Sequence, residues 1–189
     1  MQAPLYWTPG NHDVDSRTVA QYRKRFGRDY YRFRVRGVEF YVLDSELLGN
    51  YDHINAPRPE PLPPETVAES ERMLDWLRKQ APQARAKPGV VRIAVQHVPV
   101  SSGGQAPDAR PYWTAQEPYR SREIELLHLL GVKDVLAGHW HKAALFAADG
   151  FTHHVAPAVS FSAGAPLCFA LHTVAANGTV TTELVKLEE

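Results

Sequence analysis

Three apolar segments of this chain each run directly into a polar cluster that contains histidine. Strands are predicted over 5–8, 90–95 and 132–136, and the clusters that follow them are Gly10-Asn11-His12-Asp13, Gln96-His97 and Gly138-His139-Trp140-His141. In open α/β sheets, ligands bind just outside the carboxyl ends of the strands. We therefore expect the three clusters to converge at one edge of a sheet.

The pattern around the clusters is typical of a mixed α/β domain. Apolar spacing predicts helices over 15–26, 64–80 and 120–130. Further strands are expected over 30–35, 38–43, 150–155, 167–174 and 179–187, and long loops over 46–64 and 99–119. No repeat or linker divides the chain, so residues 1–189 are expected to form a single domain.

Composition excludes several classes of function. Lys plus Arg and Asp plus Glu each total 21, and this zero net charge argues against binding driven by nucleic acid or by an anionic membrane. No apolar stretch approaches the roughly 18 residues of a membrane segment, and the start lacks the features of a secretory signal. The single cysteine, Cys168, excludes an internal disulfide and favours a reducing, cytoplasmic compartment. The oligomeric state stays open.

The glycines and the paired histidines suggest how the clusters act. We expect Gly10 and Gly138 to allow sharp turns and a close approach to an ion. His139 and His141 can both face the site only if the turn after Gly138 breaks the alternation of strand side chains. One imidazole beside a strand is more often a hydrogen-bonded structural residue than a ligand, but three similarly placed clusters favour a ligand site.

The ordered set G-N-H-D, a lone histidine after a strand, and G-H-x-H resembles the calcineurin-like metallophosphoesterases. G-H-x-H arises by chance in a chain of this length on the order of once in a hundred. The stretches VRGVEFYVLDSELLG and GVKDVLAGHWHKAALF are similar to the bacterial and animal branch of that family. The resemblance implies a four-layer αββα sandwich and a phosphoester substrate, hydrolysed by a water that two metal ions activate.

The resemblance also implies roles for individual residues. Asn11, His97 and His139 would bind one divalent ion, and His141 would bind the other. His12 would contact the phosphate and protonate the leaving oxygen, with Asp13 orienting its ring. The expected ions are manganese, iron or zinc.

Two motifs of the family pattern, D-x-H and G-D-x-x-D, do not occur in this sequence. They would supply carboxylate ligands, so we expect an N-terminally incomplete domain that lacks its N-terminal strands and carries part of the metal site. Neutral ligands favour zinc or nickel over manganese or magnesium. The alternative is a non-catalytic metal-binding or interaction module that retains the second half of the fold. A separate chain that supplies the missing motifs is a further variant.

Several other polar residues are weaker candidates. Asp44 and Ser45 can line the pocket or cap a turn. Side chains of the two long loops are candidates for substrate contact; they are Asp108, Arg110, Tyr112 and Trp113, and less strongly Tyr51 and His53. Structural roles are expected for the remaining histidines, of which His153 and His154 cannot both face the site; the others are His128 and His172.

Overall fold

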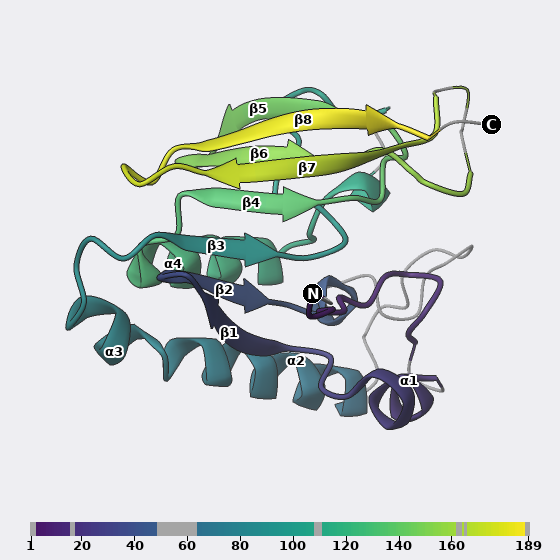
Figure 1. The fold of residues 1–189 in the computed structure, drawn as a ribbon. Helices are drawn as coiled ribbons and strands as arrows, with labels where there is room; N and C mark the ends of the chain where they lie inside the picture. Colours follow the sequence, from purple (N-terminus) through teal and green to yellow (C-terminus); the bar gives the residue numbers. More distant parts are fainter. Residues whose placement is uncertain are drawn as a thin grey trace.

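A six-stranded sheet forms the centre of the computed structural model, which describes residues 3–15, 18–48, 64–107, 111–161, 164 and 166–187. The strand order is β1-β2-β3-β4-β6-β5 (Figure 1). The inner strands β2, β3, β4 and β6 are parallel, and the outer strands β1 and β5 are antiparallel to their neighbours. The bounds are Tyr31–Val35 (β1), Val38–Val42 (β2), Arg92–Val95 (β3), Asp134–Ala137 (β4), Ala144–Ala148 (β5) and Phe151–Val155 (β6).

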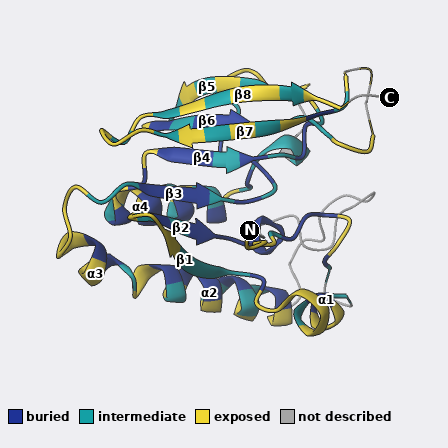
Figure 2. Ribbon diagram, viewed as in Figure 1, coloured by how far each residue is buried: buried dark blue, intermediate teal, exposed yellow. Residues whose placement is uncertain are grey.

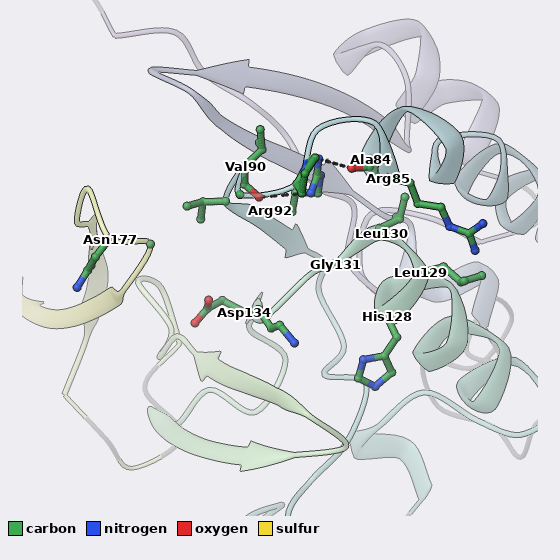
Figure 3. Close-up of a pocket in the computed structure, with 15 residues that line it drawn as sticks. Ala84, Arg85, Val90, Arg92, His128, Leu129, Leu130, Gly131, Asp134 and Asn177 are labelled. Carbon is green, nitrogen blue, oxygen red and sulfur yellow. Dashed lines mark hydrogen bonds between the residues drawn. The ribbon is translucent and has the colours of Figure 1, made fainter.

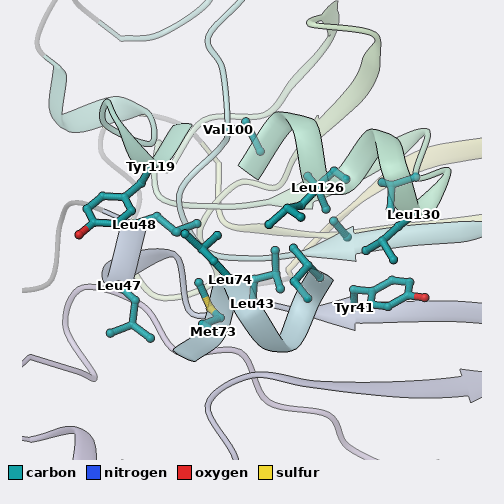
Figure 4. Packing of buried hydrophobic residues seen from close by; sticks show 14 of the residues in the cluster. Tyr41, Leu43, Leu47, Leu48, Met73, Leu74, Val100, Tyr119, Leu126 and Leu130 are labelled. Atoms are coloured by element: carbon teal, nitrogen blue, oxygen red, sulfur yellow. The ribbon is translucent and has the colours of Figure 1, made fainter. Parts of the chain in front are cut away.

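Helices cover one face of this sheet. They are α2 (Pro64–Arg78), α3 (Ala81–Arg85) and α4 (Tyr119–Leu130), while α1 (Val19–Phe26) and the short 3₁₀ helices η1 (Ser45–Leu48) and η2 (Pro111–Trp113) belong to the connections. Leucines of α2 and α4 pack with Tyr41 in one buried cluster (Figure 4). The alternation of strand side chains places Tyr41, Ala94 and Val135 on this face, so removal of their apolar surface from water holds the helices to the sheet.

A second, two-stranded sheet lies on the other face. It consists of β7 (Cys168–Val174) and β8 (Val180–Lys186). His154 of β6 connects the two sheets, because its Nδ1 lies 2.7 Å from the hydroxyl oxygen of Thr182. Among the described residues, the helices, the central sheet and the small sheet make three layers. The family resemblance implies a sandwich of four layers.

On β1 and β2, the side of the sheet away from the helices carries aromatic rings of intermediate burial. Figure 2 shows β1 as intermediate to exposed. The Phe33 ring stacks on Tyr6 at a centroid distance of 3.6 Å and on Phe40 at 4.8 Å. Tyr6 itself is 45% exposed. Among the described residues, β7 and β8 are the strands on this side of the central sheet, and they lie near β6 and away from β1 and β2.

The mixed α/β class is confirmed, together with most of the predicted elements. The prediction of a strand over 5–8 is wrong: in the described chain this segment pairs with no strand, and its backbone is instead held by the Tyr31 hydroxyl, which donates to the carbonyl of Trp7 at 2.7 Å. The helix predicted from residue 15 begins at Val19. Strand β5, with the sequence ALFAA, was not predicted because it has little β-branched content.

The structure also bears on the predicted absence of a membrane segment. Across the described ranges, no helix combines the length and the apolar character that crossing a bilayer requires.

Candidate functional site

Asn11, His97 and His139 meet at the carboxyl end of the parallel strands. His97 Nε2 donates to Asn11 Oδ1 at 2.8 Å, and His139 Nδ1 lies 3.2 Å from the same His97 nitrogen. His97 follows β3 and His139 follows β4, while Asn11 comes from the turn that closes with a bond from Asp13 N to Gly10 O at 2.8 Å. Three distant segments thus bring one oxygen and two nitrogens to a single point.

Gly10 allows this close approach because it has no side chain. A Cβ at position 10 would lie 2.9 Å from Cγ of His97, a separation that real Cβ atoms do not show. A Cβ at Gly138 would meet the same ring at 3.7 Å, which is ordinary contact. Glycine is therefore required at position 10 by space.

The special backbone angles that were expected at Gly10 and Gly138 lie instead at two histidines. His139 has φ of 67° and His141 has φ of 53°, whereas neither Gly10 nor Gly138 has a positive φ. Such angles are uncommon for residues with a side chain, and backbone strain of this kind clusters at functional sites. The two left-handed residues break the strand alternation after β4, as the sequence requires if both are to face the site.

Burial keeps the two inner imidazoles neutral. It is the main reason that the pKa of His97 is lowered to about 3 and that of His139 to about 4, with smaller contributions from the neighbouring histidines. His139 Nε2 donates to the carbonyl oxygen of Tyr112 at 3.1 Å, so this nitrogen carries the proton. The Nδ1 lone pair of His139 consequently faces the meeting point.

His12 and His141 lie at the margin of the cluster. His12 is exposed, and His141 is half-buried with its ring 5.5 Å from that of Phe161. Asp13 Oδ2 accepts a bond from the backbone N–H of Gly10 at 3.0 Å and so stabilises the turn. The orienting role of Asp13 toward His12 stays a prediction.

The three inner donors fit one metal ion. Two ligands about 2.1 Å from an ion and about 90° apart are themselves separated by about 3 Å, and the observed separations are 2.8 and 3.2 Å. A neutral imidazole can present either nitrogen to an ion, since the proton on His97 Nε2 can reside on Nδ1 instead. The described residues contain no group of three or more His, Cys, Asp or Glu that could hold a metal. The three donors that meet here are one amide oxygen and two imidazole nitrogens.

Two of the predicted substrate-contact residues pack against this cluster from η2. Asn11 Nδ2 donates to the hydroxyl oxygen of Tyr112 at 2.8 Å, and Trp140 Nε1 donates to the carbonyl of Trp113 at 2.8 Å. The sequence placed both residues only in a nearby loop. The candidates outside the described residues are Tyr51, His53, Asp108 and Arg110.

A buried acidic pair lies beyond β2. Asp44 Oδ1 accepts from the backbone N–H of Glu46 at 3.1 Å, which supports its turn-capping interpretation. Both carboxyl oxygens of Glu46 are buried without a hydrogen-bond partner. Burial raises the pKa of Glu46 to about 8, and the nearby charge of Asp13 adds to the effect. No signal in the sequence marks this glutamate, because one in a segment such as SELL is usually exposed.

The remaining histidines lie elsewhere. His128 Nε2 donates to the carbonyl of Asp149 at 2.9 Å, and His153 stacks on Phe146 on the helix side of the sheet. His154 Nε2 lies 2.9 Å from Asp134 Oδ1, and His172 Nδ1 lies 2.9 Å from the Thr182 hydroxyl. These contacts lie outside the cluster of Asn11, His97 and His139 and support the structural roles expected of the four histidines.

A cavity of about 480 Å³ opens at the opposite edge of the sheet (Figure 3). Arg92, His128 and Asp134 contribute to its wall. Arg92 Nη2 donates to the carbonyl of Ala84 at 3.0 Å, and its Nη1 donates to that of Val90 at 3.4 Å. Because these residues begin β3 and β4 or end α4, the cavity is separate from the histidine cluster.

Comparison with protein families and curated proteins finds clear similarity. The family model described as calcineurin-like phosphoesterase matches residues 1–143. Serine/threonine-protein phosphatase CPPED1 of Danio rerio is 30% identical over 166 residues, which is 85% of this chain and 49% of that protein. The Bos taurus protein of the same name is 32% identical over 147 residues, 75% of this chain and 42% of that protein. The chain spans about half the length of the curated relatives it matches.

Comparison with solved structures finds a similar fold. A structure titled "GAP50 the anchor in the inner membrane complex of Plasmodium" matches with a TM-score of 0.55 at 18% identity. The match covers 84% of this chain and 50% of that one. At this identity the likeness concerns the fold alone.

Proposed function

Because the chain belongs to the calcineurin-like phosphoesterase family, as its motifs predicted, we propose that it takes part in metal-dependent hydrolysis of phosphoric esters. The meeting of Asn11, His97 and His139 at one point is the observation that carries the proposal. The animal relatives named as protein phosphatases support both the activity and the predicted branch.

Asn11 Oδ1, His97 Nε2 and His139 Nδ1 would hold one divalent ion, and His141 would contribute to a second. The bound ions supply an acidified water and offset the negative charge of the phosphoryl oxygens. His12 is exposed beside this set and can donate a ring N–H proton to the oxygen of the leaving group. Asp13 holds the turn that carries His12, through its bond to Gly10 N.

The donor set favours particular ions. Its described members are neutral, so nothing in the set offsets the charge of a dication. Zinc or nickel, which prefer nitrogen ligands, should bind this chain more tightly than manganese or magnesium. Manganese, iron or zinc are the candidates for the complete site of the family.

We also propose that residues 1–189 form one incomplete phosphoesterase domain that other polypeptide completes. The chain spans 49% and 42% of two relatives. The partly covered aromatic face of β1 and β2 is where further strands could pack. Such polypeptide could also bring carboxylate ligands, which the set of Asn11, His97 and His139 does not include.

The proposed role of His12 as proton donor indicates which phosphoric esters the site would hydrolyse. An alkoxide leaving group is a strong base and needs a proton, which His12 is placed to provide. Phosphoserine or phosphothreonine has such a leaving group, and the printed name of the relatives supports this choice. Long nucleic acid is disfavoured by the zero net charge.

Hydrolysis of an aryl phosphate and of a phosphoserine peptide tests the proposal, on this chain and on a version with an N-terminal portion restored. We expect turnover by the restored version that falls at least about 100-fold in His12→Ala. His128→Ala is the matched control, since this exposed histidine lies at the far edge of the sheet. A restored protein that binds two ions yet cleaves neither substrate would refute the proposal.

The donor set of two imidazoles and one amide, with no carboxylate among the three, favours a second candidate. In this alternative the chain is a non-catalytic metal-binding or interaction module. It predicts cooperative unfolding of the isolated chain, with one bound ion and no turnover, and no gain of activity when an N-terminal portion is restored.

A further inference from the structure

Tyr112 contacts two of the three proposed ligands with different atoms. Its hydroxyl oxygen accepts from Asn11 Nδ2 at 2.8 Å, and its backbone carbonyl accepts from His139 Nε2 at 3.1 Å. We propose that Tyr112 is a positioning residue that holds Asn11 and His139 in their cation-binding orientations. This inference rests on the cation site proposed above.

The hydroxyl decides which end of the Asn11 amide faces inward. Asn11 is 2% exposed, so its NH₂ group needs a protein acceptor when its oxygen points toward an ion. The Tyr112 hydroxyl oxygen is that acceptor. Without it, the inward orientation of Oδ1 would leave a buried donor unpaired, which is unfavourable.

The carbonyl decides which nitrogen of His139 is available. A carbonyl oxygen can only accept, so the bond from Nε2 fixes the proton there and leaves the lone pair on Nδ1. Partners of this kind typically change metal affinity 10- to 100-fold when they are lost. One residue therefore sets the amide orientation and the tautomer together.

Further contacts hold Tyr112 in place. Its ring centroid lies 4.4 Å from that of His139 and 5.0 Å from that of Trp113. The next carbonyl, of Trp113, accepts from Trp140, which is 3% exposed. The short helix η2 is thus anchored on the turn that bears His139, and a phenylalanine at position 112 would keep the ring contacts while losing only the hydroxyl.

A double-mutant cycle on zinc affinity, measured by competition with a chromophoric chelator, tests the inference. We expect Tyr112→Phe to weaken Zn²⁺ binding about 10-fold. In an Asn11→Ala background the same change should have no further effect, because the hydroxyl acts through Asn11. Tyr30→Phe is the matched control, since Tyr30 packs on Trp76 at a centroid distance of 5.3 Å and away from the cluster.

Nitrogen NMR of the metal-free chain gives a readout independent of zinc. His139 should carry its proton on Nε2 in both the wild type and Tyr112→Phe, whereas the side-chain amide protons of Asn11 should exchange faster in the variant. Equal zinc affinities for the wild type and Tyr112→Phe, or an additive loss in the cycle, would overturn the positioning role alone. A wild type that binds no zinc would instead refute the proposed cation site.

Discussion

Individual residues of the candidate site differ in how far the sequence alone could predict them. The meeting of the motif residues could be predicted from the sequence because a cluster that contains histidine follows each of three strand-like segments. The sequence offered Tyr112 only as a candidate for substrate contact and did not mark Glu46, since the contact of the first and the burial of the second depend on segments far apart in the chain. The sequence indicated only that the backbone after Gly138 must break the strand alternation if His139 and His141 are both to face the site. It did not predict the left-handed angles that these two residues adopt.

Replacement of Gly10 with alanine should disrupt the cluster. The new Cβ would lie 2.9 Å from the His97 ring, so the ring or the turn must move. Overpacking of this kind costs about 1–3 kcal/mol, which urea unfolding would measure, and zinc affinity should fall as well. Gly138→Ala is the control, because its Cβ meets His97 at 3.7 Å and should leave both quantities nearly unchanged.

Buried Glu46 should make stability depend on pH. Its pKa rises from 4.5 in the unfolded chain to about 8 in the folded one, so the folded state retains a proton that the unfolded state releases. Wild-type stability should therefore fall as pH rises from 4.5 to 8. Glu46→Gln should remove this part of the fall, so the variant should gain stability relative to the wild type as pH rises through this range.

Urea unfolding at several pH values, on both proteins, measures this difference. Burial also raises the pKa of Glu123 to about 8, so the variant retains the contribution of that residue. An identical pH dependence for wild type and Glu46→Gln would contradict the buried, protonated state of Glu46.

Helices could be predicted where apolar residues recur at helical spacing and a residue such as glycine ends the segment. The helices over 64–80 and 120–130 were predictable because leucines recur on one side and Gly131 ends the second in a left-handed conformation. Residues 5–8 resemble a strand in composition, yet they have no strand partner in the described chain. Strand pairing depends on a distant neighbour, which a local pattern does not reveal.

A buried ion pair joins neighbouring strands β2 and β3. Arg92 Nε lies 3.0 Å from Glu39 Oε2, with both side chains about 5% exposed. Glu39→Leu should destabilise the fold by about 3–5 kcal/mol, because it leaves the buried charge of Arg92 without its carboxylate partner. The double variant Glu39→Leu with Arg92→Met should recover most of this loss.

Urea unfolding of the single and double variants checks this prediction. Arg78→Ala is the control, since its pair with Asp75 is exposed and should contribute less than about 1 kcal/mol. If the Glu39→Leu single variant is as stable as the wild type, the interior is not the low-dielectric environment that the burial indicates.

The whole molecule has one well-covered sheet face and one partly open face. The family and the α/β class were predictable from ordered motifs, but the extent of the open face required the strand order and the position of β7 and β8. Alternation along β7 leaves Phe169 and Leu171 on its outer side, 42% and 49% exposed. Large apolar side chains exposed close together favour association.

Self-association of the isolated chain should therefore depend on the outer side of β7. We expect sedimentation velocity to show weight-average mass rising with concentration, and the variant Leu171→Thr to reduce the rise while preserving strand preference. Thr173→Ser, on the same side of the strand, is the control. A wild-type mass that does not change with concentration would contradict the prediction that the outer side of β7 drives self-association.

Zinc titration of the wild type and His139→Ala tests most directly whether Asn11, His97 and His139 form a cation site. We predict about one Zn²⁺ per wild-type chain and a loss of at least 10-fold in affinity for His139→Ala. His172→Ala should bind as the wild type does, because His172 bonds Thr182 in the small sheet. Near-ultraviolet circular dichroism would establish that each variant is folded. Equal zinc affinity for the wild type and a folded His139→Ala would contradict the account.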